Sequence, residues 1–415
     1  MASPLAAPLE FDPYAYEVHE DPYPVYARLR AEAPVYRNVR LGFWALSRYA
    51  DVLAGFRDWQ RFSSRFGVSI DAGTFHENAS ATMSFLAMDP PRHDRLRALV
   101  SKVFTPRRVA ALEPRIRAMA IAYLDALMPG DGCDFIGDFA GKLPMDVISE
   151  MLGVPSADRA MLRGWADDMV HRDEGVHEMP KAAIEGGLRA LQYFSEMLVQ
   201  RRKRGSPSSG RGSPPSQQPV DDLTGALVGA EIDGDRLSDR EIIGFLILMV
   251  VAGNETTTKL LGNALYWLWR NPSQRDLLRR DPSLVPRWVE ETLRYDNSTQ
   301  SLARVMAADV ELHGQKLRCG DQVVLLLGSG NRDERVFPDP DRYDLLRDTS
   351  ASLSFGQGIH FCLGASLARL EGRVALEEVW KRMPDYEVDP AGLVRVHSVN
   401  VRGFAALPIA FGRTP

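Results

Sequence analysis

The sequence predicts a mainly α-helical protein with small β-sheets. Apolar residues recur at the three- and four-residue spacing of amphipathic helices along much of the 415-residue chain. The clearest helical segments are Val25–Ala33, Pro106–Leu127, Lys181–Arg202, Ser238–Arg270, Pro286–Arg294 and Ala365–Met383. Strand-like stretches lie between them, at Val35–Leu46, Val310–His313, Val323–Leu327 and near the C-terminus. Because helices and strands do not alternate regularly, a parallel α/β sheet is not expected.

The segment from Ser238 to Arg270 predicts one very long helix. Ser238 and Glu241 have the spacing of a capping box at its start, and Asn271-Pro272 closes it. At ~1.5 Å per residue the helix is about 50 Å long. Its middle is apolar almost all round, so it should run through the core of one large domain. We therefore expect a single domain over residues 1–415, although the length alone would allow two or three.

Residues 204–219 interrupt the helical pattern with the sequence RGSPSSGRGSPPSQQP. Such a stretch buries too little apolar surface to offset its ordering entropy, which predicts a flexible loop. Either it is a surface insertion between two helices or it links two domains. We favour the insertion because the motifs described below come from both sides of it.

The composition excludes several classes of protein. A formal net charge of -5 lacks the basic excess typical of nucleic-acid binding. Three dispersed cysteines, Cys133, Cys319 and Cys362, predict neither a disulfide framework nor a cysteine-rich zinc site. The N-terminus has no signal-peptide pattern, and the longest apolar run, Ile242–Gly253, is shorter than the ~20 residues of a membrane span. We expect a cytoplasmic monomer that contacts no membrane.

The chemistry is concentrated around Cys362, in the segment SFGQGIHFCLGASLARLE from Ser354 to Glu371. Glycines allow tight turns and close approach of the backbone to a flat ligand. A cysteine next to a helix N-terminus is favoured as the thiolate, which suits it to metal ligation. For an isolated cysteine, a buried free thiol in a turn would be the simpler interpretation.

The pattern F-G-x-G-x-H-x-C-x-G around this cysteine resembles the haem-binding signature of the cytochrome P-450 superfamily. The resemblance implies that Cys362 is the proximal ligand of a haem b iron, and that Phe355 packs near its sulfur. It places Gly356, Gly358, His360 and Gly364 in the same loop. It also implies the single-domain cytochrome P-450 fold, with a long central helix over the haem.

The central helix carries the sequence Ala252-Gly253-Asn254-Glu255-Thr256-Thr257. An acid and a hydroxyl in an apolar helix are costly to bury without partners. Thr256 could simply bond back to the carbonyl of Ala252. The sequence also resembles the family's oxygen-activation motif. That resemblance implies that Gly253 opens a groove, that Thr256 hydrogen-bonds dioxygen, and that Glu255 helps to deliver protons.

Glu291 and Arg294 have E-x-x-R spacing and lie one turn apart on a predicted helix. Alone, they would be an ordinary surface ion pair of little energetic value. Upstream of the cysteine loop, they resemble the buried Glu-Arg pair of the family, with Arg342 expected as the third member. Their expected role is structural.

Haem carboxylates need cationic or hydrogen-bonding partners. The segment Asp89-Pro90-Pro91-Arg92-His93, followed by Arg97, resembles the family's D-P-P-x-H-x-x-x-R helix. The resemblance implies that His93 and Arg97 bind propionates, together with Arg304 and His360. Each of these residues alone could be a solvated surface side chain.

The implied activity is a monooxygenase that uses dioxygen to hydroxylate or epoxidise a medium-to-large lipophilic substrate. No length remains for a fused electron-transfer domain, so a separate ferredoxin and ferredoxin reductase are the expected electron donors. A docking face could include Lys102, Arg107, Arg108 and Arg373, or these could be scattered solvated charges. The alternatives are a peroxide-driven peroxygenase, a haem-thiolate isomerase or reductase, and a non-catalytic haem sensor. The intact Glu255–Thr256 pair argues against the peroxygenase and the sensor.

By family analogy, the substrate pocket should include parts of Phe66–Leu86, Leu248–Thr257, Ser298–Leu302 and Val399–Val401. The chain departs from the family pattern at two places. The segment at 204–219 is longer than usual, and Asn297–Ser301 lacks the proline common after the E-x-x-R helix.

Overall fold

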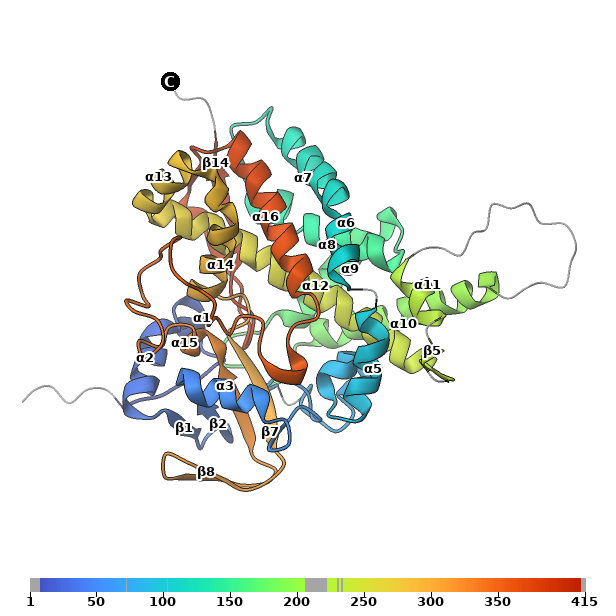
Figure 1. The fold of residues 1–415 in the computed structure, drawn as a ribbon, viewed down its shortest axis with the longest axis vertical. Coiled ribbons are helices and arrows are strands. Elements are labelled where there is room, and N and C mark those ends of the chain that lie inside the picture. Colours follow the sequence, from blue (N-terminus) through green and yellow to red (C-terminus); the bar gives the residue numbers. More distant parts are fainter. Residues whose placement is uncertain are drawn as a thin grey trace, which may run out of the picture.

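The computed structural model describes residues 8–71, 73–102, 104–205, 222–229, 231–232 and 234–411. Most of the expected flexible loop, positions 206–219, lies outside the described residues. The described part is mainly helical with small sheets, as predicted. Figure 1 shows helices packed on both sides of one long helix, with the larger sheet at one end of the molecule.

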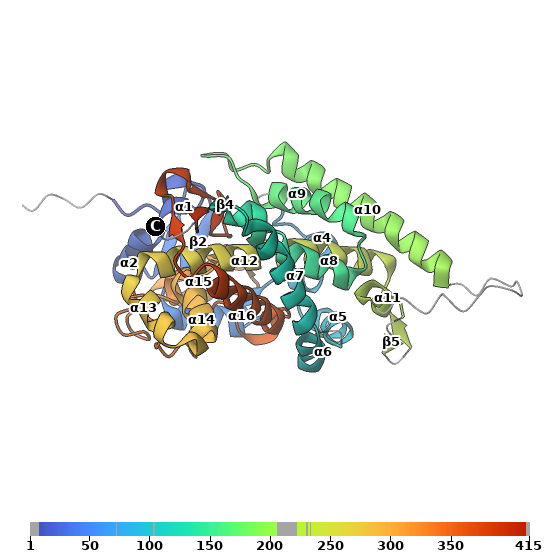
Figure 2. The ribbon, with the colours of Figure 1, turned by 90° about the horizontal axis from the view of Figure 1, so that it is seen from above.

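The long helix is α12 (Asp239–Arg270). Ser238 accepts a hydrogen bond from the Glu241 backbone, and the Glu241 side chain bonds back, so the predicted capping box is present. By length and composition α12 could cross a membrane, but 67% of its most apolar window is buried inside the protein. It packs against α4 (Ser80–Met83), α8 (Leu143–Leu152), α9 (Arg159–Val170), α10 (Lys181–Gly205), α14 (Val285–Tyr295) and α16 (Ala365–Arg382). Figures 1 and 2 both show α12 passing through the middle of the molecule.

The predicted helix over 106–127 is two helices, α6 (Pro106–Ala111) and α7 (Glu113–Leu127), which meet at Leu112. Pro114 explains the break, because proline has no N–H to donate and its ring clashes with the carbonyl four residues earlier. The other described helices are α1 (Tyr16–Glu20), α2 (Tyr23–Glu32), α3 (Tyr49–Arg57), α5 (Arg92–Ser101), α11 (Leu223–Val228), α13 (Pro272–Arg280) and α15 (Leu327–Gly330).

The larger sheet has the strand order β1-β2-β10-β7-β3. Its strands are β1 (Val35–Asn38), β2 (Phe43–Leu46), β3 (Phe62–Ser63), β7 (Ser301–Met306) and β10 (Gln322–Leu326). Only the β2–β10 pairing is parallel. The stretch predicted as one strand at 35–46 is therefore a hairpin, because Gly42 adopts a positive φ of 75° and reverses the chain.

The remaining strands form small antiparallel pairs or a three-stranded sheet. β8 (Val310–Leu312) pairs with β9 (Gln315–Leu317), which confirms the strand predicted near Val310. The others are β4 (Gly132–Asp134), β5 (Glu231–Ile232), β6 (Asp235–Arg236), β11 (Glu387–Val388), β12 (Val394–Arg395), β13 (Phe404–Ala406) and β14 (Pro408–Ala410). One apolar core cluster contains residues from Phe85 to Ile409 and includes the buried large apolar side chains of α12.

Candidate active site

The cysteine loop folds back on itself immediately before α16. The backbone N–H of Cys362 donates to the carbonyl of Phe355, at 2.9 Å. Gly356 and Gly358 have φ values of 67° and 70°, which side chains rarely tolerate. A Cβ at Gly358 would also lie 2.6 Å from the backbone oxygen of Phe56. The glycines of the motif are thus needed to form the turn that presents the cysteine.

Cys362 faces a large cavity. The cavity holds about 1330 Å³ of empty space, part of it open to solvent. Cys362 is exposed to this hollow, although protein otherwise surrounds its side chain. Burial raises the pKa of the Cys362 thiol, while the backbone N–H groups of Gly364 and Ala365 and the guanidinium of Arg97 act in the opposite direction. The loop therefore holds donors that favour a thiolate once a cation is bound to it.

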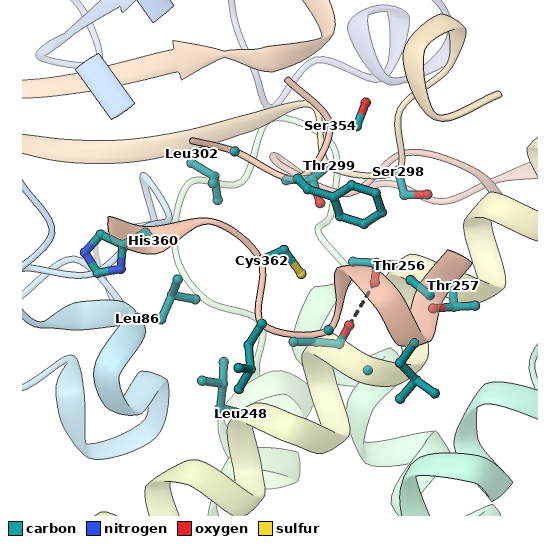
Figure 3. Close-up of a pocket in the computed structure, with 18 of the residues that line it drawn as sticks. Leu86, Leu248, Thr256, Thr257, Ser298, Thr299, Leu302, Ser354, His360 and Cys362 are labelled. Atoms are coloured by element: carbon teal, nitrogen blue, oxygen red, sulfur yellow. Dashed lines mark hydrogen bonds between the residues drawn. The ribbon is translucent and has the colours of Figure 1, made fainter. Parts of the chain in front are cut away.

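Helix α12 forms another wall of the same cavity. Ala252, Gly253, Thr256 and Thr257 all line it. The Thr256 Oγ1 donates a hydrogen bond of 2.8 Å to the Ala252 carbonyl, so the simple back-bonding geometry is confirmed. Figure 3 shows this bond, with Thr256 and Cys362 bordering one hollow. The structure thus brings the thiol and the hydroxyl of two distant motifs to a common space.

Glu255 does not line the cavity. Its side chain is 2% exposed and is held by Lys259, whose Nζ lies 3.2 Å from Oε2. Although burial alone would raise the pKa of Glu255, Lys259 holds it below its usual range. Lys259 is four residues along the helix from Glu255, a spacing that the sequence could have revealed.

A second carboxyl, that of Asp167 on α9, interacts electrostatically with Glu255. Burial, and then this contact, raise the pKa of Asp167 to about 8. The Asp167 side chain is nevertheless 49% exposed, so Asp167 connects the buried Glu255 carboxylate with the solvent. No sequence signal linked Asp167 to α12.

Three candidate propionate contacts have buried side-chain nitrogens without partners. Arg304, on β7, is 1% exposed, and its Nη2 has no hydrogen-bond partner in the part of the chain that the structure describes. Burial lowers the pKa of Arg304 to about 10. The Nε2 of His93 and both ring nitrogens of His360 also lack partners, and the two rings lie 4.5 Å apart. Buried donors are rarely left unpaired, so this arrangement fits an anionic group that binds here.

Arg97 is the fourth candidate propionate contact. It lines the cavity beside Cys362, and its Nη2 donates to the Phe361 carbonyl at 2.5 Å. The structure therefore brings Arg97, Arg304 and His360 to the cavity walls from α5, β7 and the cysteine loop, with His93 packed behind them against His360. A haem with its thiolate ligand and two carboxylates matches both the volume and the donor set.

The other cavity walls are mostly apolar and agree in part with the expected pocket. Phe85 and Leu86 line it, as do Leu248, Met249 and the stretches around 252–257 and 297–302. The expectation for Val399–Val401 is wrong, because Val399 and Val401 border a separate small cavity. That turn packs behind the wall, where Gln300 donates to the Asn400 carbonyl at 2.8 Å.

The predicted buried pair of Glu291 and Arg294 is confirmed. The two side chains are 1% and 0% exposed, with nitrogen–oxygen distances of 2.7 and 2.8 Å. Arg294 also donates to the carbonyls of Asn331 and Pro340, each at 2.9 Å. The pair thus fastens α14 to the irregular segment that leads to the cysteine loop.

The expectation that Arg342 is the third member of the Glu291–Arg294 group is wrong. Its guanidinium is 63% exposed and pairs with Asp344, at 3.3 Å. Arg347 takes the position instead, with its Nε 3.4 Å from Glu291 and a side chain only 9% exposed. The turn at 338–342 directs its backbone carbonyls inward and Arg342 outward, which sequence spacing alone could not reveal.

The candidate docking face is only partly free. Arg373 is paired with Glu113 at 2.5 Å and with Glu377 at 3.0 Å. Lys102, Arg107 and Arg108 are exposed, and they form no ion pair with any described residue. Three of the four expected cations therefore remain available to a partner.

Comparison with known proteins agrees with this geometry. Residues 188–391 match the family model described as Cytochrome P450. The chain is 51% identical over 403 residues to cytochrome P450 123 of Mycobacterium tuberculosis, covering 97% of each protein. It is 40% identical to the vitamin D(3) 25-hydroxylase of Pseudonocardia autotrophica, covering 95% of this chain and 94% of that protein.

A solved structure gives the same result for the fold. The chain is similar to CYP109E1 from Bacillus megaterium in complex with testosterone, with a TM-score of 0.86 and 32% identity. The match covers 96% of this chain and 99% of that one. Sequence relatives and fold agree over nearly the whole length, and the chain belongs to the cytochrome P450 family of haem-thiolate monooxygenases.

Proposed function

We propose that the protein inserts one oxygen atom of dioxygen into a medium-to-large lipophilic substrate, by hydroxylation or epoxidation. The observation that carries this proposal is the shared cavity of Cys362 and Thr256, which has unpaired buried donors at one end. The cofactor is haem b, with Cys362 as its iron ligand. His93, Arg97, Arg304 and His360 bind its propionates, and Phe355, Gly356 and Gly364 form the loop beneath it.

When bound, haem supplies the activation of dioxygen, which uses two electrons and releases the second oxygen atom as water. The protein positions the substrate and delivers protons. The apolar walls around Leu248 and Leu302 exclude water and hold the substrate. Gly253 and Ala252 keep the helix backbone open to the cavity, and the Thr256 hydroxyl on that wall becomes a donor to the cavity once it releases the Ala252 carbonyl.

Protons enter, on this proposal, through the carboxyl pair. Asp167 is in contact with solvent, and burial and Glu255 raise its pKa to about 8, which favours its protonated form. It passes the proton to Glu255, which is next to Thr256 on the helix. Glu255 must leave Lys259 to deliver this proton, since in the present geometry it does not reach the cavity.

The substrate class is supported by the cavity and by the relatives. No side chain other than Arg97, Arg304, His360, Cys362 and Glu371 brings an ionisable group to the described cavity walls. Burial raises the pKa of Glu371 well above its usual range, which favours the neutral carboxyl. A hydroxylase of vitamin D(3) and a structure in complex with testosterone also point to bulky lipophilic molecules.

The electrons come from a separate ferredoxin and its reductase, which dock on a face that includes Lys102, Arg107 and Arg108. Residues 1–415 form a single domain, an assignment supported by a core cluster that joins both sides of the 204–219 segment. The enzyme works in the cytoplasm.

The test is turnover with a ferredoxin, its reductase and ¹⁸O-labelled dioxygen, over a panel of neutral lipophilic compounds. One labelled oxygen in a product supports the assignment. Thr256→Ala and Glu255→Gln should consume electrons while forming several-fold less product. Full coupling in both variants would contradict the proton-delivery roles. Product formed only from hydrogen peroxide would instead indicate a peroxygenase.

A further inference from the structure

The outer side of α10 carries an apolar stripe that faces solvent. Ile184, Leu188, Leu191 and Val199 are 51%, 60%, 42% and 51% exposed. They make up four of the ten exposed large apolar side chains in the described residues. Isolated exposed apolar residues are ordinary, but a contiguous set on one helix marks an interaction surface.

The stripe is distinct from the face that α10 buries in the protein. Its residues recur at spacings of four, three and eight, which places them on one side of the helix. Ala183, Ala190, Phe194 and Leu198 are buried and form the adjoining, inner side. The apolar surface of helix α10 is therefore wide, and the fold covers only one side of it.

Nothing in the described chain lies over this stripe. Figure 2 shows α10 as the outermost helix on its side of the molecule, with α9 beneath it. Ser195, which falls within the stripe, donates its hydroxyl to the Leu191 carbonyl at 2.6 Å and so adds little polarity. Met161 on α9 and Val176 before α10 are further exposed apolar residues of this α9–α10 region.

We propose that the stripe binds the same stripe of a second copy of this chain, with the two α10 helices antiparallel. A two-fold axis near Leu188 brings Leu188 against its own copy. The same axis puts Ile184 of one chain opposite Leu191 of the other. Such an isologous contact needs a surface that complements itself, and most soluble oligomers are built in this way.

The charges beside the stripe favour a second copy over a strongly charged partner. Lys181 and Arg189 carry positive charge, and Glu185 and Glu196 carry negative charge, so they cancel. Within one chain, Glu185 lies only loosely paired, 3.6 Å from Lys181 and 3.7 Å from Arg189. In the antiparallel pair Glu185 of one copy lies beside Arg189 of the other, on both sides of the axis. At the C-terminal end of α10, Arg202 pairs with Asp239 and Lys203 is exposed, so the stripe offers an anionic membrane or an acidic protein little net positive charge.

The association should be weak. One helix-to-helix contact with its flanking residues buries less than the roughly 1,200 Å² of stable complexes. We expect dimers at tens of micromolar protein and monomers below about 1 micromolar. The sequence had suggested a monomer, because nothing in an amphipathic pattern distinguishes an inner apolar face from an outer one until both are placed.

Sedimentation velocity of the haem-loaded protein between 1 and 200 micromolar tests the proposal. We expect a concentration-dependent shift toward the dimer, abolished by Leu188→Glu, which puts like charges at the axis. Val39→Glu is the matched control, since Val39 is 84% exposed outside the α9–α10 region. A wild type that stays monomeric, or a Val39→Glu variant that also loses the dimer, would overturn it. So would Leu188-dependent binding to neutral or anionic vesicles without self-association.

Disulfide trapping tests the antiparallel geometry independently. In a Cys319→Ser background, which removes the one exposed cysteine outside the active site, Leu188→Cys should cross-link two chains under mild oxidation. Val199→Cys should not. Residue 199 lies eleven positions from 188, so at ~1.5 Å per residue the two copies of 199 are about 33 Å apart. Equal cross-linking at both positions, or none at 188, would contradict the arrangement.

Discussion

Arg347 is predicted to stabilise the protein far more than Arg342, although Arg342 is the residue that the motif order suggested. Arg347 is 9% exposed and lies 3.4 Å from Glu291. It also donates to the carbonyls of Pro338 and Asp339, at 2.5 and 2.9 Å. Arg347→Ala removes these contacts and leaves a buried carboxylate with one cation instead of two. Breaking a buried network of this kind costs about 3 kcal/mol.

The matched variant Arg342→Ala should cost at most about 1 kcal/mol, because its pair with Asp344 is at the surface. For 415 residues the unfolding entropy is about 0.9 kcal/mol per degree, so the expected changes in Tm are about 3 °C and at most 1 °C. Because the Arg347 segment leads to the cysteine loop, Arg347→Ala should also lose haem faster when mixed with an excess of apomyoglobin.

Differential scanning fluorimetry of both variants, with haem content measured in parallel, is the assay. An Arg342→Ala variant at least as destabilised as Arg347→Ala would refute the assignment of Arg347 to the Glu291–Arg294 network.

Two further predictions concern charged side chains that do not line the cavity. Because the pKa of Asp167 is raised to about 8, its stabilising contribution is complete below the ordinary carboxyl pKa and is lost as the pH rises through 8. Unfolding free energy should thus fall from pH 6 to pH 9 by about 1 kcal/mol more in wild type than in Asp167→Asn, after allowance for solvent screening. If the unfolding free energies of the wild type and of Asp167→Asn, measured by denaturant titration, fall equally from pH 6 to pH 9, the raised pKa of Asp167 is contradicted. Asp71 and Arg172 form a buried bidentate pair at 2.7 and 2.9 Å that joins loops 101 residues apart. Asp71→Asn should cost about 3 kcal/mol in denaturant titrations, whereas the double change Asp71→Leu with Arg172→Met should recover most of the stability.

Periodicity and caps were sufficient to predict most of the helices. The central helix was predicted to within one residue, because Ser238 and Glu241 form a capping box and Asn271-Pro272 stops it. Predicted helix and strand boundaries were wrong where a single residue changes the direction of the backbone. Pro114 divides a predicted helix, and Gly42 turns one predicted strand into a hairpin.

The site could be predicted where one continuous motif specifies both the functional side chain and the backbone conformation that presents it. The loop of Gly356, Gly358 and Cys362 is one continuous segment whose glycines are required by positive φ. Contacts between distant segments could not be predicted. Asp167 reaches Glu255 only because α9 packs on α12, and Arg347 replaces Arg342 only because of the local turn.

The central claim is that Cys362 ligates a haem iron, and the absorption spectrum of the reduced protein with carbon monoxide tests it most directly. The wild type should show the red-shifted band characteristic of thiolate-ligated haem. Cys362→Ser, folded to the same extent by circular dichroism, should lose that band. A properly folded wild type with no haem band, or with the shorter-wavelength band of nitrogen-ligated haem, would contradict the assignment.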